Sequence, residues 1–230
     1  SRIDSSGLVR LTLASALQRL PISFRLELAM GLASRQEDAN DHNLPMIVWA
    51  GITPMVENDP DGLLAIARSS QWPVLRTWIA RAITEGSKEQ PMVFHSLLDL
   101  IVEQPNHAES LLAGIERAVL GIKGFLKPAK WDLVRSKLSM NPTVLKLSVI
   151  FGDIQATHEM EKVVVDEKVD SNIRRQTLGI LIDSDTPNLQ SLCEKLLTDP
   201  ELKVLAVRGL AKYESLGIGE KITNILGEFS

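Results

Sequence analysis

Carboxylates, amides and an imidazole crowd into one stretch of this chain, residues 38–43. The groups that could bind a ligand there are Asp38, Asn40, Asp41, His42 and Asn43. Carboxylate and amide oxygens at alternating positions are the ligands that a hard cation such as Ca²⁺ takes, although the stretch has neither the glycine nor the closing glutamate of an EF-hand loop. A structural interpretation is that Asp41 or Asn43 caps a helix beginning at Leu44. We favour capping, and keep a partner contact and a metal or small-ligand site as alternatives.

Other groups that could carry out catalysis are scattered along the sequence. The four histidines are His42, His95, His107 and His158. No two of them stand three or four residues apart and no cysteine pairs with them, so the spacing favours neither a zinc nor a haem site. The single cysteine, Cys193, lies on an apolar stripe without a base nearby in sequence, which predicts a buried, unreactive thiol. We therefore expect no catalytic residue, no metal ligand set and no cofactor in this chain, and a non-enzymatic function.

Three arginines recur at the same place in a repeated pattern. Arg10, Arg76 and Arg174 each follow the first apolar residue of a helical stripe, and Lys203 takes this place in the last one. In stacked helical repeats such an arginine commonly bridges to an acidic residue of the next repeat. We interpret all four as structural repeat positions.

The stripe itself runs along the whole chain. In the last one, Leu202, Ala206, Gly209 and Leu210 fall on one side of a helix, where the small residues let a neighbouring helix come close. Earlier stripes begin at residues 9, 44, 75, 111, 144 and 173, so the period drifts between about 29 and 36 residues. This is typical of helical pairs that stack into one core. The proline-led entry into the second helix, clearest at 71–76 and 199–210, resembles HEAT repeats.

The expected fold is all-α, a right-handed α-α superhelix or HEAT/armadillo-like solenoid of about seven helical pairs. Aromatic residues make up only 4% of the chain, which favours aliphatic helix packing over a β-sandwich. We expect one domain over 1–230, excised from a larger protein, with a possible bend at 121–128. The tryptophans are expected in the core, with Trp72 the most exposed. We expect helices at 46–55, at 107–120 after an Asn106 cap, at 200–213 and at 217–226.

Charge and hydropathy narrow the classes of partner. The net charge is −4 with acidic and basic residues interspersed, so no basic face for nucleic acid is visible. No apolar run is long enough to insert into a membrane. We expect a protein partner, or flanking domains of the parent chain, on a concave face lined by the second helices. Arg35, Arg68 and Arg81 are candidates for that contact.

A more specific resemblance covers residues 8–84. It is carried by residues 11–21, 38–49 and 75–81, which look like the helical middle segment of large multidomain proteins of Planctomycetes and their relatives. Members of that membrane-bound dehydrogenase/cytochrome c type carry an N-terminal β-propeller and a C-terminal cytochrome c domain with a CxxCH haem site. The resemblance implies a spacer between redox domains of an exported, periplasmic protein. This chain has no CxxCH motif, so the resemblance implies no chemistry within it.

Overall fold

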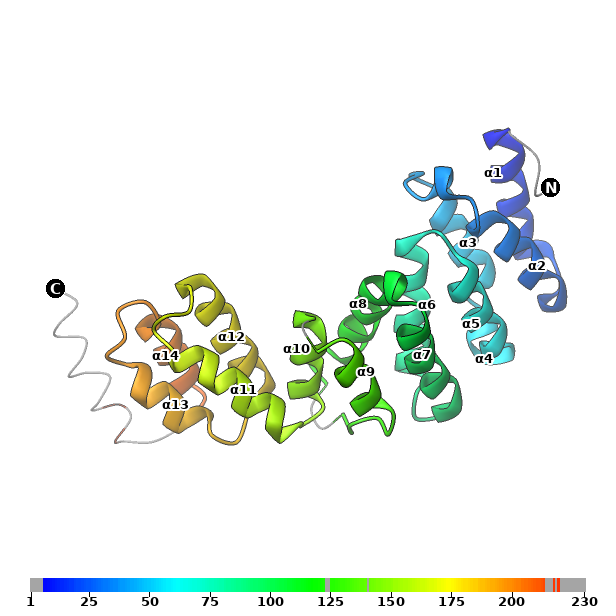
Figure 1. Cartoon of the computed structure of the whole chain (residues 1–230). Coiled ribbons are helices and arrows are strands. Elements are labelled where there is room, and N and C mark those ends of the chain that lie inside the picture. Colours follow the sequence, from blue (N-terminus) through cyan, green and yellow to red (C-terminus); the bar gives the residue numbers. More distant parts are fainter. Residues whose placement is uncertain (1–5, 123–124, 140, 214–216, 218, 220–230) are drawn as a thin grey trace. The chain divides into compact units, whose positions relative to one another are not determined.

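The computed structural model describes residues 6–122, 125–139, 141–213, 217 and 219. Over these residues the prediction of an all-α fold is confirmed, because they hold fourteen α-helices, three short 3₁₀ helices and no strand (Figure 1). The helix expected at 217–226 lies outside the described residues apart from two positions. The chain divides into two compact units, which we describe separately. They comprise the described residues of Ser1–Leu120 with Pro128–Val144, and of Gly121–Lys127 with Leu145–Ser230.

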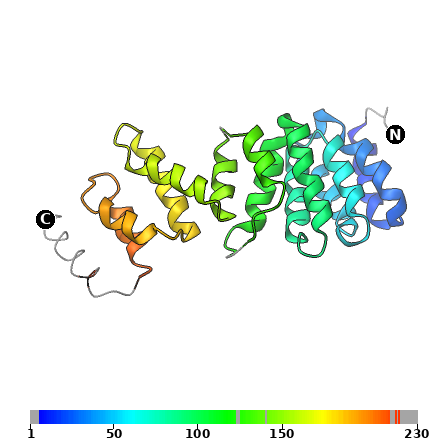
Figure 2. The ribbon, with the colours of Figure 1, turned by 60° about the horizontal axis from the view of Figure 1, so that its bottom comes forward.

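The first unit arranges its helices in two layers. The layer that carries the repeated stripe consists of α1 (Gly7–Ala16), α3 (Leu44–Ile52), α6 (Pro73–Glu85) and α8 (Ala108–Val119). The other layer consists of α2 (Ile22–Ala33), α5 (Pro60–Ser69), α7 (Pro91–Glu103) and α9 (Trp131–Lys137), with the short α4 (Met55–Asn58) packed on α5. Within each layer every helix packs on the next one, and they stand side by side in Figure 2. The three 3₁₀ helices are Leu17–Arg19, Gln36–Asp38 and Pro105–His107.

The second unit follows the same order of elements. It takes most of α10 (Pro142–Ile150), then α11 (Ile154–Val165), α12 (Ser171–Ser184), α13 (Leu189–Leu196) and α14 (Lys203–Leu210). Helix α11 packs on α12 and α13 packs on α14, while the stripe helices α12 and α14 also contact each other. A Cβ added to Gly209 would lie 2.6 Å from Cys193 Sγ, so α13 and α14 approach closely where the stripe places its small residue.

Local sequence explains where many of these helices begin. Asp59, Asp153 and Asp170 each accept a hydrogen bond from a backbone N–H of the first turn, which satisfies a donor that the helix leaves unpaired. Proline occupies the first or second position of α3, α5, α6 and α7, where its missing N–H costs nothing.

Three expected helix boundaries are wrong. The helix expected at 46–55 ends at Ile52, and α4 follows separately after Pro54, which cannot donate a backbone hydrogen bond. Helix α8 begins at Ala108, because Asn106 lies within a 3₁₀ segment and does not cap it. Helix α14 begins at Lys203 rather than 200, because a turn separates it from the capping residue Asp199.

The prediction for Trp72 is also wrong. Its side chain is 0% exposed, and its indole Nε1 donates a hydrogen bond of 2.7 Å to the Arg35 carbonyl oxygen at the end of the preceding pair. This partner lets the indole N–H be buried without loss of hydrogen bonding. The half-buried tryptophans are instead Trp49 and Trp78, whose ring centroids lie 6.2 Å apart across α3 and α6.

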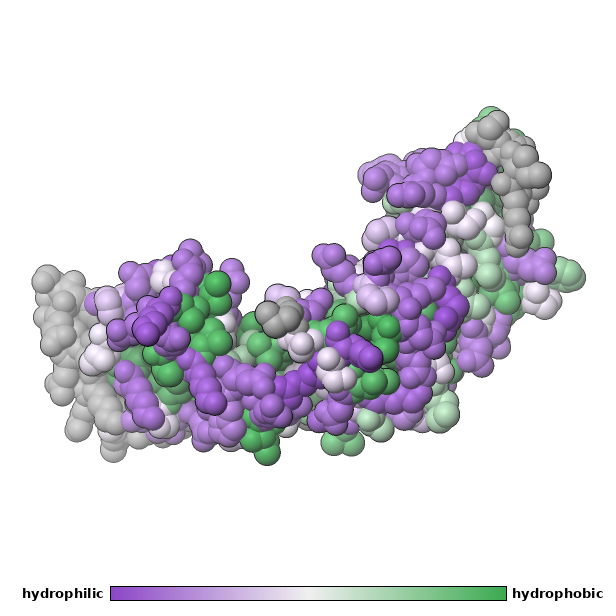
Figure 3. Space-filling view, in the orientation of Figure 1, coloured by the Kyte–Doolittle hydropathy of each residue, from purple (hydrophilic) through white to green (hydrophobic). Residues whose placement is uncertain are grey.

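The surface is mixed in polarity. On the face drawn in Figure 3, hydrophilic and hydrophobic residues alternate over each unit. Within the described part of the chain, no helix combines the length and the apolar character needed to cross a membrane.

Cys193 is predicted to react only after unfolding. Its side chain is 0% exposed, and burial raises the pKa of the thiol to about 11 against a smaller opposing effect of the Lys212 charge. Because the thiolate is the reactive form, a disulfide reagent near pH ~8 should modify the folded chain at least about 100-fold more slowly than the urea-unfolded chain. Equal rates in the two states would show that the thiol is accessible in the fold.

Candidate functional site

Asp38, the first residue of the polar stretch at 38–43, is buried and ion-paired. Its carboxylate oxygens lie 2.7 Å from Arg10 Nη2 and 2.6 Å from Arg10 Nε, and both side chains are only 9% exposed. Arg35 Nε lies a further 3.9 Å from the same carboxylate. The carboxylate therefore joins α1 to the segment before α3 and does not face solvent as a ligand would.

Asp41 lies two residues before Asn43, the N-cap residue of α3, and its side chain bonds to the start of the helix. Its Oδ1 accepts hydrogen bonds from the backbone N–H groups of Leu44 at 2.7 Å and Asn43 at 2.9 Å. These two bonds stabilise the carboxylate and lower its pKa. The side chains of Asn40, His42 and Asn43 are exposed. Over the residues that the structure describes, no group of three or more His, Cys, Asp or Glu side chains is placed to hold a metal ion.

This arrangement predicts the response of the 38–43 stretch to calcium. Replacing Asp41 with alanine should lower the free energy of unfolding by about 1 kcal/mol, since it removes a helix cap. Added Ca²⁺ should leave the melting temperature of the wild-type chain unchanged in differential scanning fluorimetry. A rise of several degrees with Ca²⁺ that disappears in Asp41→Ala would instead support a metal site in this stretch.

The recurring arginines each connect one stripe helix to the next stripe helix or to the segment before it. Arg76 donates to the Ser70 carbonyl oxygen at 2.6 Å and to Ser110 Oγ of α8 at 2.8 Å. Arg174 donates from Nε to the Val164 carbonyl oxygen at 2.8 Å and pairs through Nη2 with Asp199. All three arginines, Arg10, Arg76 and Arg174, are buried, with between 5% and 7% of their surface exposed. The fourth predicted position, Lys203, is half-buried and begins α14.

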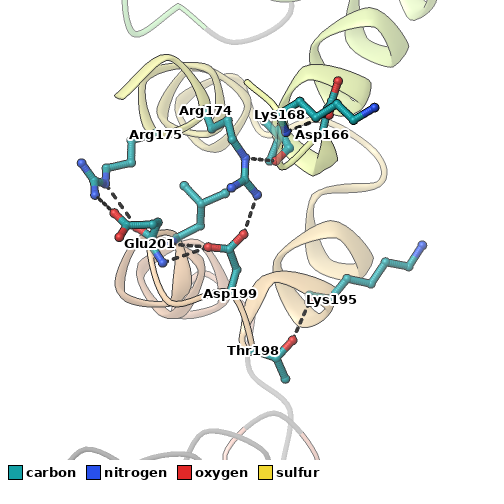
Figure 4. A network of polar contacts seen from close by, with 10 residues as sticks. Asp166, Lys168, Arg174, Arg175, Lys195, Thr198, Asp199 and Glu201 are labelled. Atoms are coloured by element: carbon teal, nitrogen blue, oxygen red, sulfur yellow. Dashed lines mark hydrogen bonds and ion pairs between the residues drawn. The ribbon is translucent and has the colours of Figure 1, made fainter. Parts of the chain in front are cut away.

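Figure 4 shows the polar network around Arg174. Asp199 receives the Arg174 guanidinium at 2.5 Å and also accepts from the backbone N–H groups of Glu201 and Leu202. Partial burial would raise the pKa of the Asp199 carboxyl, but the bonds from Arg174 and the backbone outweigh it and lower that pKa. Next to this buried pair, Arg175 pairs with Glu201 in a more exposed position.

The arginines expected to contact a partner are all engaged within the chain. Arg68 pairs with Glu103 at 2.6 Å and Arg81 with Glu85 at 2.7 Å, while Arg35 pairs with Glu37 at 2.5 Å. Only Arg81 lies on a helix of the stripe layer. The structure therefore does not bring these three residues together on one face.

A groove in the described residues of the second unit follows α11 and α13. It comprises three adjoining hollows of about 480, 610 and 550 Å³. The first and second share His158 and Asn188, and the second and third share Val165 and Lys195. We call this the α11–α13 groove. It lies mainly on helices that do not carry the repeated stripe, whereas the sequence led us to expect the partner contact on the second helices.

The first hollow of the groove is mainly apolar. Phe125 and Phe151 stack at a centroid distance of 5.4 Å in its wall, and Leu126 and Ile154 beside them are 85% and 72% exposed. The Oγ1 atom of Thr186, which belongs to the same hollow, is buried and has no hydrogen-bond partner among the described residues. This end of the groove can receive an apolar side chain.

The central hollow contains two lysines without partners. Lys162 and Lys195 stand in the last turns of α11 and α13, and no carboxylate of the described residues lies within ion-pairing distance of either. The one carboxylate of this hollow, Glu161, already contacts His158 Nδ1 at 3.0 Å. In Figure 4 the Lys195 side chain extends away from the Arg174–Asp199 pair. Glu161 Oε1 is buried and has no hydrogen-bond partner among the described residues. The hollow therefore holds two lysines and one carboxylate, and its balance of charge is positive.

Sequence reasoning missed the α11–α13 groove. Lys162 and Lys195 are ordinary exposed lysines by pattern, and the sequence between them gives no sign that they line one hollow. The weak signal was their shared place in the last turn of successive non-stripe helices.

Comparisons with protein-family models, with curated proteins and with solved structures find no match. The function must therefore be argued from the site itself.

Proposed function

We propose that this chain is a non-catalytic scaffold that binds a segment of a partner protein. The observation that carries the proposal is the α11–α13 groove, an open channel with an apolar end and unpaired positive groups at its centre. The buried ionic groups elsewhere support it, since Arg10, Arg76 and Arg174 contact neighbouring helices and are engaged in packing. A groove of this size along two helices suits several side chains of a peptide.

For the arrangement of the helices, we infer a HEAT-like, right-handed solenoid. In each unit the stripe helices pack on one another, and an arginine at the repeated position joins consecutive pairs, which supports stacking of similar units. An experimental structure tests this inference. A left-handed rotation between consecutive pairs, or no consistent rotation, would contradict it.

The binding function can be tested by selection without knowledge of the partner. A phage-displayed library of random dodecapeptides is panned against the immobilised full chain, and enriched sequences are resynthesised with a fluorescent label. We expect saturable binding in fluorescence anisotropy with a Kd of about 1 to 100 µM. Failure to enrich any sequence that rebinds as a free peptide would count against a peptide-binding scaffold.

We also propose the spacer role that the resemblance of residues 8–84 implies, in which the chain separates redox domains of a larger exported protein. The quoted residues 11–21, 38–49 and 75–81 support it. The test is to read the complete reading frame around this segment and to record a visible spectrum of the native full-length protein. A propeller upstream, a CxxCH motif downstream and a haem band are expected. A frame without either domain would refute the spacer role and leave the binding proposal to stand alone.

A further inference from the structure

We propose that the α11–α13 groove binds an acidic linear segment of a partner protein. An acidic side chain lies between Lys162 and Lys195, and an apolar side chain of the same segment enters the hollow beside Phe125 and Ile154. This inference rests on the proposed function and names the chemistry of the partner.

The two lysines of the central hollow favour binding of an acidic group there. Lys162 and Lys195 reach the same hollow from two successive helices, and neither has a carboxylate partner among the described residues. Two ammonium groups in one hollow repel each other, so an anion between them gains from both and relieves that repulsion. The floor below them includes Leu192, which is 7% exposed, and this apolar surface strengthens a charge contact by excluding water.

The first hollow, at the apolar end of the groove, favours an apolar side chain close to that acidic group in the bound segment. The first hollow adjoins the central one through His158 and Asn188, so one segment can occupy both. Its rim carries exposed Leu126 and Ile154, whose burial under a bound side chain is favourable.

A protein segment fits this surface better than a nucleic acid does. Glu167 at the far end of the groove would repel a continuous phosphate backbone, and the chain as a whole has a net charge of −4. A segment with one or two acidic residues places its charge at the lysines only. Apolar contact at one end and charge contact at the centre together define its direction along the groove.

The experiment uses peptides selected on the full wild-type chain as above. We expect enriched sequences to combine at least one Asp or Glu with a large apolar residue. In fluorescence anisotropy the double variant Lys162→Glu/Lys195→Glu should bind the labelled peptide at least about tenfold more weakly. Leu126→Ser/Ile154→Ser should also weaken binding. Affinity should fall as added salt shortens the Debye length from about 10 Å to about 3 Å.

A charge-matched control separates a local effect from one of net charge. Lys88→Glu/Lys137→Glu makes the same change in net charge at exposed lysines outside the groove, and it should bind the peptide as the wild type does. A peptide with its acidic residue changed to lysine should bind the Lys162→Glu/Lys195→Glu variant better than the wild type. Circular dichroism checks that each variant is folded.

The outcomes distinguish this inference from the proposed function. If no peptide is enriched, the proposed function fails and this inference fails with it. If peptides bind but Lys162→Glu/Lys195→Glu leaves their affinity unchanged, the scaffold function stands and the acidic-segment inference is overturned. Tighter binding of labelled oligouridylate than of any selected peptide, lost in the same variant, would also overturn it in favour of a nucleic-acid partner.

Discussion

Replacing Gly114 with alanine should lower the free energy of unfolding of the first unit by about 3 kcal/mol. Gly114 lies in α8 where this helix crosses α6, and α6 and α8 form the most extensive helix contact in the described residues. A Cβ at Gly114 would lie 2.4 Å from the Thr77 carbonyl oxygen, 2.7 Å from Ala80 Cβ and 2.9 Å from the Arg81 backbone nitrogen. Two of these atoms belong to the backbone of α6, so no side-chain rotation relieves the overlap and the helices must separate.

Separation would also weaken polar contacts between α6 and α8. Thr77 Oγ1 donates to the Ser110 carbonyl oxygen at 2.9 Å, and Arg76 Nε donates to Ser110 Oγ at 2.8 Å. Thr77 Oγ1 keeps the Pro73 carbonyl oxygen within 3.1 Å, but Arg76 is buried and its Nε would lose Ser110 Oγ. A buried donor without a partner costs about 1 to 3 kcal/mol. The loss from Gly114→Ala therefore exceeds what the added methyl group alone would produce.

Tryptophan fluorescence in a urea titration measures this effect selectively. The four tryptophans, Trp49, Trp72, Trp78 and Trp131, all lie in the first unit. The matched control is Gly179→Ala in α12 of the second unit, where nothing lies within 4 Å of the added Cβ, so it should leave the midpoint detected by tryptophan fluorescence unchanged. Equal midpoints for wild type and Gly114→Ala would show that α6 and α8 are not in this close contact.

Features that act over a short stretch of chain could be predicted from the sequence. Asp41 caps α3 through backbone groups two and three residues ahead, so the residue type and its place before an apolar run were sufficient. The recurrence of Arg10, Arg76 and Arg174 likewise follows from the period, and the first of them finds its partner Asp38 28 residues later. Periodicity brings such residues to equivalent places without knowledge of the packing.

Features that depend on a particular contact between distant elements could not be predicted from the sequence. Trp72 is buried because the Arg35 carbonyl oxygen, 37 residues earlier, accepts its indole N–H. Asp199 pairs with Arg174, which lies 25 residues earlier. The α11–α13 groove brings together Lys162 and Lys195 from two helices that are separated in sequence by α12.

The buried pair in the second unit leads to an expected result of similar size. Replacing Arg174 with methionine should lower the free energy of unfolding of this unit by about 3 kcal/mol, since removing one partner leaves a poorly solvated charge. The side chains of Arg174 and Asp199 are only 6% and 13% exposed. The variant also leaves the Val164 carbonyl oxygen without the donor it has in the wild type. Methionine retains much of the volume, so the loss reflects polar contacts more than a cavity.

The adjacent arginine supplies the control. Arg175 lies on the same helix and also pairs with the start of the next one, but it and its partner Glu201 are 42% and 49% exposed. Arg175→Met should therefore cost less than about 1 kcal/mol. Far-UV circular dichroism in urea records both variants, while hydrogen exchange of peptides from α11 to α14 assigns the change to the second unit. Equal losses for the two substitutions would show that burial does not distinguish the pairs.

The difference in stability between wild type and Arg174→Met should depend on pH, which provides a further check on the Arg174–Asp199 pair. The pKa of Asp199 lies below its ordinary value of about 3.9, so its ionised form stabilises the fold at neutral pH. This contribution is fully present above the ordinary pKa and is lost as the pH falls through the lowered value in the folded chain. Arg174→Met removes the main favourable partner, so the difference in stability between wild type and variant should stay constant from pH ~7 to about 4. The two stabilities should then converge as the pH falls from about 4 to about 2. A difference that stays constant over this range would mean that Arg174 stabilises the unit by packing and by its bond to Val164, without a contribution from the Asp199 charge.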